Sequence, residues 1–256
     1  MYHFFVEPGQ IQGTRIYITG KDVNHIKNVL RMRIGEEVSV GNGMDGKEYR
    51  CAIDAFEEDS VVCKLLFIKE DGVELPVKVT LFQGLPKADK MELIIQKAVE
   101  LGVYQIVPVA TKRCVVKLDA KKEASKIARW QAIAEAAAKQ SKRAVVPQIC
   151  PVMTMGEAIQ AASKMEHCII PYELAEGMSK TKEIFASFTP GSSVAVFIGP
   201  EGGFEEKEIE AAAAAGVEPI SLGKRILRTE TAGFTVLSWI MYELEVRQDN
   251  SNPLKK

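Results

Sequence analysis

Residues 194–208 read VAVFIGPEGGFEEKE, in which a β-branched apolar run ends in Gly-Pro-Glu-Gly-Gly and an acidic segment follows. This order of residue types predicts a buried strand, a tight glycine-rich turn and a helix. Such a turn exposes backbone N–H groups at the carboxyl edge of a sheet, where α/β proteins bind their ligands. The stretch favours an α/β sheet with a ligand site at the turn, although a tight turn without a ligand would use the same glycines.

The charges of this turn argue against a phosphate ligand. Its Gly-Pro-Glu-Gly-Gly spacing differs from the G-x-G-x-x-G of a dinucleotide-binding loop. It is not a P-loop either, because no Gly-Lys-Ser/Thr follows the glycines. Glu205 and Glu206 occupy the positive end of the predicted helix, and Glu201 would repel a dianion at the centre of the turn. We therefore expect a neutral or cationic ligand.

Strands and helices alternate on both sides of the turn. The predicted strands cover residues 77–84, 103–110, 167–172, 193–198 and 218–222; the predicted helices cover 87–102, about 123–142, a segment between 172 and 193, a segment that ends at Gly216, and 231–246. This alternation implies a mostly parallel sheet covered on both faces. The lysines and glutamates of the helix at 87–102 are interpreted as ordinary surface charges.

The first ~75 residues have a different pattern, because short strands replace the alternation. Segments 2–6, 15–19, 36–42, 47–53 and 60–68 are rich in β-branched and aromatic residues, and one helix is predicted from about Asp22, as its N-cap, to Leu30. Strands that close on one another predict a small barrel. We place the domain boundary near residues 70–76, which gives a β-barrel domain of residues 1–75 and an α/β domain of residues 76–256.

Composition and charge narrow the class of protein. The chain has 256 residues, 46% of them hydrophobic, and a net charge of −1. No leader or membrane span is expected, and five widely spaced cysteines indicate reduced thiols, so we expect a cytoplasmic protein. The three histidines are scattered, so no metal site is expected. The helix at 231–246 is apolar nearly all round, which makes a homodimer interface a reasonable hypothesis.

Basic residues gather in two places. Residues 112–143 hold ten Lys/Arg against three Asp/Glu, and Arg113, Lys117 and Arg143 are candidate phosphate contacts because they lie near element ends. Residues 221–234, SLGKRILRTETAGF, place Arg225 and Arg228 around two apolar residues. These arginines could pair with a phosphate or a base oxygen, although an exposed basic loop would explain this motif taken alone.

A resemblance emerges when the motifs are taken together. IGPEGGF (198–204) and LGKRILRTETA (222–232) lie downstream of MELIIQKAVELGV (91–103) and VPVATKRCVVK (107–117). Over essentially the whole chain, this combination resembles the bacterial 16S ribosomal RNA (uracil-N3)-methyltransferases of the SPOUT superfamily. HIKNVLRMRIGEEV (25–38) is similar to the small PUA-like RNA-binding barrel of that family.

The resemblance implies a fold, a cofactor and partners. It implies a SPOUT-type α/β trefoil-knot domain after the PUA-like barrel, with S-adenosylmethionine held in a bent shape by the loops of the knot. It also implies a homodimer through the methyltransferase domain, with 16S ribosomal RNA in the small ribosomal subunit as its substrate. General experience argues against a knot, since true knots are nearly absent from proteins.

The resemblance also assigns roles to individual residues. The implied cofactor-binding residues are Tyr172, Gly199, Pro200, Gly202, Leu222, Gly223, Ile226, Leu227, Thr229, Thr231 and Ala232; the candidate RNA-binding residues are His25, Arg31, Arg33, Arg113, Lys117, Arg143 and Arg225. His25, Arg31 and Arg33 match the RNA-domain signature of the family. His3 stands where the family often has an early arginine.

The residues are consistent with methylation of a ring nitrogen. Transfer from a sulfonium needs no enzyme nucleophile, and no cysteine falls in a candidate loop, which disfavours carbon-5 methylation of a pyrimidine. Arg228 is the candidate for stabilising the anion left by loss of the uracil N3 proton, and Glu201 or Glu230 is the candidate proton acceptor. Two alternatives are a nicotinamide-dependent enzyme, which lacks its dinucleotide turn here, and a non-catalytic RNA-binding protein.

Overall fold

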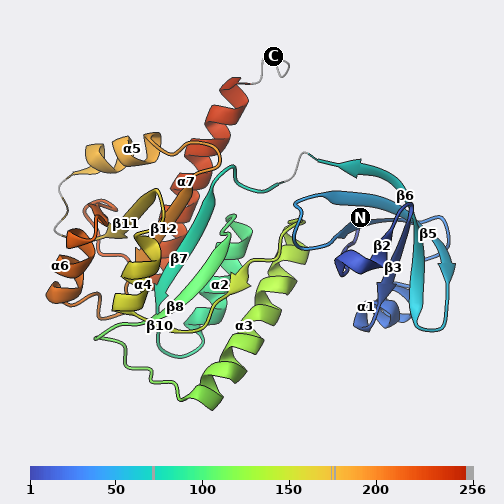
Figure 1. Ribbon diagram of the computed structural model, residues 1–256, viewed down its shortest axis with the longest axis horizontal. Coiled ribbons are helices and arrows are strands. Elements are labelled where there is room, and N and C mark those ends of the chain that lie inside the picture. The colour runs from blue at the N-terminus through green and yellow to red at the C-terminus, as the bar shows by residue number, and fades with distance from the viewer. Residues whose placement is uncertain (71–72, 174, 176, 252–256) are drawn as a thin grey trace. The chain divides into compact units, whose positions relative to one another are not determined.

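The computed structural model describes residues 1–70, 73–173, 175 and 177–251, with backbone only for 248–251. The chain forms two compact units (Figure 1). The N-terminal unit contains residues 1–74 together with 138–146, and the C-terminal unit contains residues 75–137 and 147–256.

The N-terminal unit is built on a six-stranded sheet in the order β1-β4-β5-β6-β3-β2. Its elements are β1 (His3–Phe5), η1 (Pro8–Gln10), β2 (Ile11–Gln12), β3 (Arg15–Thr19), α1 (Lys21–Asn24), η2 (His25–Val29), β4 (Glu37–Gly41), β5 (Glu48–Phe56) and β6 (Ser60–Lys69). β1 runs parallel to β4, and the other pairs are antiparallel. The predicted strands are confirmed.

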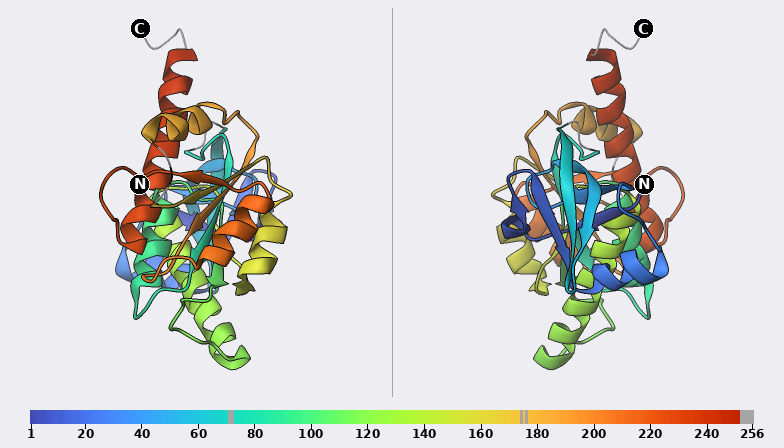
Figure 2. Two further views of the ribbon diagram at one scale, coloured as in Figure 1. Left: turned by 90° about the vertical axis from the view of Figure 1, so that its left-hand side faces the viewer. Right: turned by 90° about the vertical axis from the view of Figure 1, so that its right-hand side faces the viewer.

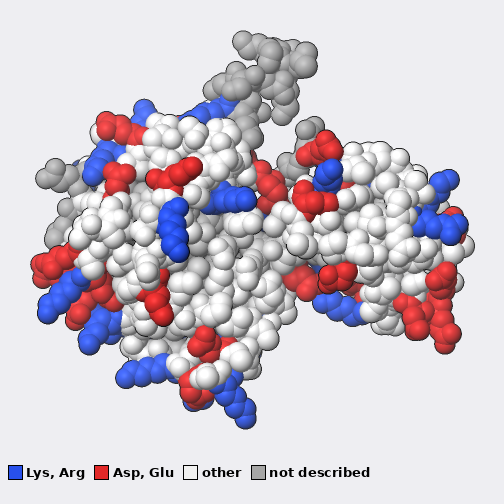
Figure 3. Space-filling model, in the orientation of Figure 1, with Lys and Arg blue, Asp and Glu red and all other residues white. Residues whose placement is uncertain are grey.

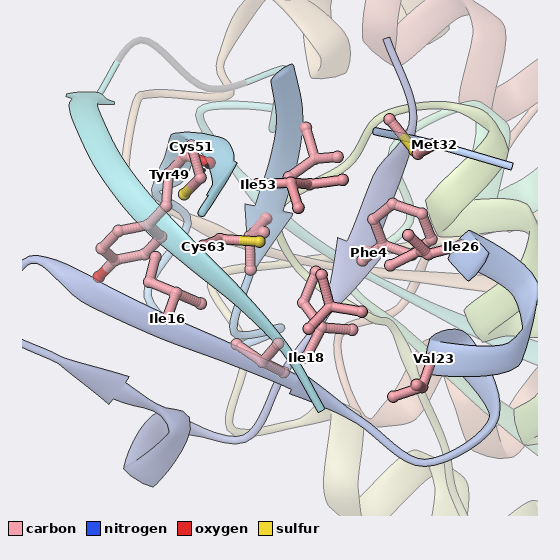
Figure 4. Close-up of a cluster of buried hydrophobic side chains, with 14 residues drawn as sticks. Phe4, Ile16, Ile18, Val23, Ile26, Met32, Tyr49, Cys51, Ile53 and Cys63 are labelled. Carbon is pink, nitrogen blue, oxygen red and sulfur yellow. Dashed lines mark hydrogen bonds between the residues drawn. The ribbon is translucent and has the colours of Figure 1, made fainter. Parts of the chain in front are cut away.

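One hydrophobic core fills this unit (Figure 4). Phe4, Ile18 and Ile53 come from three different strands and point into the same cluster, which Ile26 of η2 completes. A sheet whose strands all contribute to one cluster must curve around it, as the barrel prediction requires. Its strand order leaves β1 and β2 at the two edges.

The helix predicted for residues 22–30 differs from the observed one. α1 begins at Lys21, after Gly20 with φ +70°, and from His25 the chain continues as a π-helical turn. Asp22 is not the N-cap, because its carboxylate accepts a hydrogen bond from Lys139 Nζ at 2.9 Å. A charged partner from residues 138–146 thus engages the side chain that capping would have used.

The C-terminal unit is a seven-stranded parallel sheet with the path β10-β8-β7-β12-β11-β13, and β9 also pairs with β8. The strands are β7 (Lys78–Gly84), β8 (Gln105–Ala110), β9 (Gln148–Ile149), β10 (Met153–Thr154), β11 (His167–Pro171), β12 (Ser193–Ile198) and β13 (Glu218–Ile220). The helices are α2 (Lys90–Glu100), α3 (Ala120–Gln140, of which residues 138–140 belong to the N-terminal unit), α4 (Met155–Ala162), α5 (Met178–Ala186), α6 (Glu206–Ala214) and α7 (Thr229–Ser251). The predicted parallel α/β sheet is confirmed.

Helices cover both faces of this sheet, as the left view of Figure 2 shows. On one face, Ala158 of α4 and Ala212 of α6 pack into a cluster with Phe82 and Phe197, whose rings stack at 4.7 Å. α7 contacts β12 and also packs against α2 on the other side of the sheet (Figure 2). Coverage on both faces explains why the central strands are apolar along their whole length.

The sequence interpretation missed α4. Thr154 accepts a hydrogen bond from Glu157 N at 3.3 Å, and the Glu157 carboxylate accepts one from Thr154 N at 2.8 Å. This reciprocal pair is a capping box, whose Thr-x-x-Glu signature is present in the sequence. Among the residues that the structure describes, no helix has the length and apolar character needed to cross a bilayer.

Candidate functional site

The carboxyl ends of the parallel strands bring the predicted loops together. Gln83, near the end of β7, pairs with Ile198 at the end of β12. Pro171, at the end of β11, pairs with Ile220 at the end of β13. Because the strands are parallel, the segments that follow residues 84, 110, 171, 198 and 220 all leave from one edge of the sheet.

Gly84 and Pro200 pack closely against each other at this edge. A Cβ atom on Gly84 would lie 2.6 Å from Pro200 Cδ and 2.7 Å from Pro200 N. No side chain fits at such distances, so only glycine lets the turn after β12 lie directly on the end of β7.

A buried hydrogen-bond network joins three segments beneath the turn. Thr229 Oγ1, at the start of α7, donates to Gly199 O at 2.6 Å and accepts from Gln83 Nε2 at 2.9 Å. Gln83 Nε2 also donates to Gly84 O at 3.0 Å. Gln83 is fully buried, and its Oε1 atom has no hydrogen-bond partner among the described residues. The network fixes the start of α7 against the glycine-rich turn.

The turn itself is compact and is contacted from β8. A Cβ on Gly199 would lie 3.2 Å from Gly203 C, and Gly203 has φ +68°. Arg113, which follows β8, donates from Nη1 to Gly202 O at 3.0 Å. Arg113 is therefore tied to the turn, while its side chain remains exposed.

Glu201, at the centre of the turn, binds the segment that precedes α2. Its oxygens accept hydrogen bonds from Lys87 N at 3.1 and 3.2 Å, and Lys90 Nζ lies 3.0 Å from Oε1. Lys90 Nζ also lies 3.5 Å from Glu230 Oε2. Burial acts to raise the pKa of Glu201, but hydrogen bonds from its own backbone, Lys90 and Lys87 outweigh it and hold the pKa below its ordinary value.

The acidic helix start is explained by capping. Glu205 is the N-cap of α6, and Glu208 Oε2 accepts from Glu205 N at 2.8 Å, which completes a capping box. Glu208 Oε1 accepts from Lys112 N at 2.9 Å. These acids stabilise the helix and the loop after β8.

The loop after β13 presents exposed side chains at the same edge. Its base is held by Thr181, whose hydroxyl exchanges hydrogen bonds with Ser221 N and O at 3.1 Å. Gly223 has φ +95°, and Ile226 is 89% exposed. The exposed residues of the loop are Gly223, Lys224, Arg225, Ile226 and Arg228, and the half-buried ones are Leu222 and Leu227. Ile226 is therefore free of contacts within the protein that would bury it, and it lies between two exposed arginines of the same loop.

The other predicted cofactor residues border this loop. Tyr172 N donates to Ile220 O at 3.0 Å, which places the end of β11 beside the loop after β13. Ala232 N donates to Arg228 O at 2.8 Å within the first turn of α7, and Thr231 is exposed on that turn. The structure therefore brings the residues predicted for the cofactor to one edge.

The predicted RNA contacts divide into exposed residues and one that is buried. His25, Arg31, Arg33, Lys117 and Arg225 are exposed. Arg143 is only 2% exposed, and its Nε lies 3.1 and 3.2 Å from the Glu74 oxygens. The prediction that Arg143 contacts phosphate is wrong, because its guanidinium is buried in an ion pair within the N-terminal unit.

Charge is mixed on the surface that Figure 3 presents. Lys and Arg side chains of the C-terminal unit alternate there with Asp and Glu rather than forming one basic patch. Some of the cations in residues 112–143 form ion pairs within the protein. Arg129 Nη2 contacts Glu92 Oε2 at 2.9 Å, and Lys122 Nζ contacts Asp119 Oδ2 at 3.0 Å. Single exposed cations are therefore better RNA candidates than the stretch as a whole.

Comparison with protein families agrees with this geometry. The family described as an RNA methyltransferase domain matches residues 73–241, and the RNA methyltransferase PUA domain matches residues 18–66. The chain belongs to the RNA methyltransferase family. Members of this family use S-adenosylmethionine as methyl donor.

Relatives resemble the chain over nearly its full length. It is 38% identical to ribosomal RNA small subunit methyltransferase E of Bacillus subtilis, with 96% of this chain and 98% of the relative covered. A ribosomal RNA small subunit methyltransferase E from Neisseria gonorrhoeae, solved with S-adenosylmethionine, is 30% identical, with a TM-score of 0.80 and coverage of 94% and 97%. A Legionella pneumophila protein solved with the same cofactor is 32% identical, with a TM-score of 0.79 and coverage of 94% and 97%.

The edge of the sheet fits S-adenosylmethionine chemically. Leu222, Ile226 and Leu227 offer apolar contacts to an adenine ring, and the buried Gln83 Oε1 is an acceptor without a donor among the described residues. Glu201 and Glu230 carry two negative charges against the single positive charge of Lys90, a balance that suits a sulfonium cation, and the glycines leave the backbone open to close approach.

Sequence reasoning missed three residues of this site. Gln83 and Gly84 read as the end of an ordinary strand, and Lys90 was interpreted as a surface charge on α2. Gly84 at the carboxyl end of a strand was a usable signal, because close backbone approach is one reason for glycine there. Nothing local distinguished Lys90 from Lys97, which pairs with Glu100 along the same helix at 2.8 Å.

Proposed function

We propose that this chain methylates N3 of a uridine in 16S ribosomal RNA of the small ribosomal subunit, with S-adenosylmethionine as methyl donor. That it is an S-adenosylmethionine-dependent ribosomal RNA methyltransferase follows from its family and from relatives that carry this name over almost all of both chains. The observation that carries the proposal is the convergence of the 199–203 turn, the 221–228 loop and the start of α7 at one edge of a parallel sheet.

We assign the predicted residues to roles in this reaction. We expect residues 76–256, apart from residues 138–146, which belong to the N-terminal unit, to form the methyltransferase domain with its loops threaded as a trefoil knot, and residues 1–75 to form the RNA-binding domain. The cofactor is held by the turn at 199–202, the loop at 222–232 and Tyr172. RNA phosphates are held by the exposed His25, Arg31, Arg33, Arg113, Lys117 and Arg225.

The chemistry needs positioning and charge stabilisation from the protein. The cofactor supplies a methyl group on a sulfonium, which an in-line displacement can transfer to nitrogen. Loss of the N3 proton leaves a negative charge on the uracil, which the exposed Arg228 guanidinium can stabilise. N3 lies on the pairing edge of the base, so the target uridine must be unpaired or flipped out of its helix.

Carbon-5 methylation through a cysteine adduct is the second candidate reaction, because the structure contains one cysteine near the edge. Cys114 follows β8 and is half-buried, with Sγ 3.2 Å from Thr111 Oγ1 and 3.6 Å from Val109 O. The other four cysteines are buried. Cys114 adjoins Arg113, a residue predicted to contact RNA, so it is the one cysteine next to a predicted site residue.

Replacement of Cys114 separates the two reactions. We expect Cys114→Ser to retain at least about half of the methyl-transfer rate, because attack by the uracil nitrogen needs no thiolate. Methyl transfer to RNA is measured with the serine variant and with Cys168→Ser as a control in the buried core. A loss of about 100-fold in the Cys114 variant alone would favour the covalent mechanism.

Transfer of labelled methyl groups tests the proposed substrate. Small ribosomal subunits purified from a strain that lacks the endogenous activity are incubated with the protein and tritiated S-adenosylmethionine. We expect label in 16S RNA and none in the RNA of large subunits treated in parallel. Binding of the cofactor without any transfer would instead indicate a non-catalytic RNA-binding protein.

The proposed enzyme acts as a homodimer in the cytoplasm. Tyr242 and Val246 on α7 are 66% and 39% exposed, although neighbouring apolar side chains of that helix are buried. Exposed apolar residues on one helix face support a partner surface there.

A further inference from the structure

Lys90 lies at the start of α2 and faces carboxylates from two other segments. Its Nζ is 3.0 Å from Glu201 Oε1 in the glycine-rich turn and 3.5 Å from Glu230 Oε2 in the first turn of α7. The side chains of Lys90, Glu201 and Glu230 are 30%, 27% and 15% exposed. A partly buried network of three charges is stronger than an isolated surface pair, so it can hold three segments together.

The Glu201 carboxylate is already engaged. It accepts from Lys87 N and from Lys90 Nζ, and Ala88, between these two residues, has φ +53°. A left-handed conformation is unfavourable for a residue with a side chain. The segment 87–90 therefore curls around the Glu201 carboxylate, whose two contacts offset that strain.

The protonation behaviour of Glu201 agrees with this geometry. Burial acts to raise the pKa of Glu201. Hydrogen bonds from its own backbone, Lys90 and Lys87 lower that pKa by more than burial raises it, so it lies below the ordinary value. The hydrogen bond to Glu201 in turn raises the pKa of Lys90. A general base works best when its pKa lies near the working pH, which makes this carboxylate a poor proton acceptor.

Resting on the proposed function, we propose that Lys90 is a positioning residue for methyl transfer, and that Glu201 holds the cofactor turn in place rather than accepting the proton. Through Glu201 and Glu230, Lys90 fixes the turn at 199–203 relative to the start of α7. In the transfer, N3 of the uridine gains the methyl group and its proton passes to water. The carbon–sulfur bond of the donor breaks, and its electron pair stays on sulfur.

A double-mutant cycle on cofactor binding tests the positioning role. Calorimetry with S-adenosylmethionine is run on the unaltered protein, Lys90→Met, Glu201→Gln and the double variant, with Lys97→Met as a matched control on the same helix. We expect each single substitution to weaken binding about tenfold, the double variant to be no weaker than either, and Lys97→Met to match the unaltered protein. Single effects that multiply in the double variant, or no effect at all, would overturn the proposal.

The split between kcat and KM tests the role of Glu201. We expect Glu201→Gln to raise KM for the cofactor about tenfold and to lower kcat by less than about tenfold at saturating cofactor. Lys90→Arg is expected to restore most of the affinity that Lys90→Met loses. Loss of a general base would instead lower kcat by about 100- to 10,000-fold with cofactor affinity unchanged, and that result would contradict the assignment.

Two controls keep the test decisive. Thermal unfolding identifies a variant that does not fold; Glu230→Gln then replaces Lys90→Met in the cycle, because it removes another member of the same network. The calorimetric cycle needs no RNA. If the unaltered protein binds the cofactor but transfers no methyl group, the proposed substrate fails while the role of Lys90 is still measured.

Discussion

Gly84 lies at the carboxyl edge of the parallel sheet, where we propose that the cofactor binds, and its packing holds that edge together most directly. Its missing side chain lets the end of β7 touch Pro200, and a Cβ would lie 2.6 Å from Pro200 Cδ and 2.7 Å from the backbone nitrogen. The neighbouring Gln83 then reaches Thr229, which binds Gly199. One absent side chain thus permits the packing of three segments.

We expect Gly84→Ala to lower the free energy of unfolding by about 1–3 kcal/mol, because the backbone of the turn must move to accept a methyl group. The turn would be displaced as well, so S-adenosylmethionine should bind more weakly. Thermal unfolding and calorimetry measure both effects. Gly156→Ala in α4 is the control, because a Cβ there meets nothing within 4 Å. Equal behaviour of the two variants would contradict the role of Gly84.

His3 is a second residue with a measurable consequence. Its Nδ1 lies 2.8 Å from Ser39 Oγ, which donates to Glu48 Oε1 at 2.7 Å, so His3 Nδ1–H is the donor to Ser39. Burial lowers the pKa of His3 from 6.5 to about 4, with Lys139 and Arg50 acting in the same direction and Glu48 against it. Between these pH values the unfolded chain binds a proton that the folded chain does not, so stability falls as pH falls.

Replacement of His3 should remove this part of the pH dependence. The loss amounts to on the order of 3 kcal/mol once the pH is below both pKa values. We expect His3→Gln, which keeps a donor for Ser39, to lose less stability than the unaltered protein between pH 7 and pH 4. Thermal unfolding followed across this range measures the difference. Parallel curves for the two proteins would refute the assignment.

Local sequence predicted the residues of the turn but not their partners. Gly199, Pro200 and Gly202 lie in a readable motif, whereas Gly84 matters only because β7 and β12 are neighbours in the sheet. The prediction that Arg143 contacts phosphate was wrong because it also depended on a distant partner. The position of Arg143 near a helix end indicated an exposed side chain, but the side chain is buried and pairs with Glu74, which is far away in the sequence.

At the scale of elements, α7 combines two surfaces. Val236, Leu237, Ile240 and Leu244 are buried, and Tyr242 and Val246 are exposed on the same helix. The buried face packs against α2 and β12. The exposed face is the part of α7 that the proposed partner subunit would cover.

We expect Tyr242→Glu combined with Val246→Glu to convert a dimer into a monomer, because two charges would be buried at the proposed contact. Sedimentation velocity at micromolar concentration measures the mass. Ile34→Glu, at a 65% exposed position of the N-terminal unit, is the control and should remain dimeric. A stable monomer in the unaltered protein would remove the hypothesis.

Hydrophobic periodicity predicted the long helices and strands but missed the short elements α4, β9 and β10. The strands at β7, β8, β11 and β12 and the helices α2, α3 and α7 follow apolar patterns. The short α4 is signalled by its capping box, and β9 and β10 have two residues each, too few for any period. The packing of residues 138–146 with the N-terminal unit depends on Asp22 and Glu74, contacts that no local pattern contains.

For the whole molecule, the net charge of −1 gives no overall attraction to RNA. Cations and anions alternate on the face of the C-terminal unit in Figure 3. In the proposed function, RNA affinity comes from a few exposed arginines and lysines in each unit, and selectivity for uridine comes from the loops at the carboxyl edge of the parallel sheet. The family could be inferred from the sequence because its motifs lie in the loops that the sheet brings together.

The identity of the modified nucleoside tests this account most directly. 16S RNA from treated subunits of a strain without the endogenous activity is digested to nucleosides and separated by liquid chromatography with mass detection. We expect one new 3-methyluridine per RNA, absent when Arg228→Ala replaces the unaltered protein. A methyl group on carbon 5, on the ribose or on another base would contradict it.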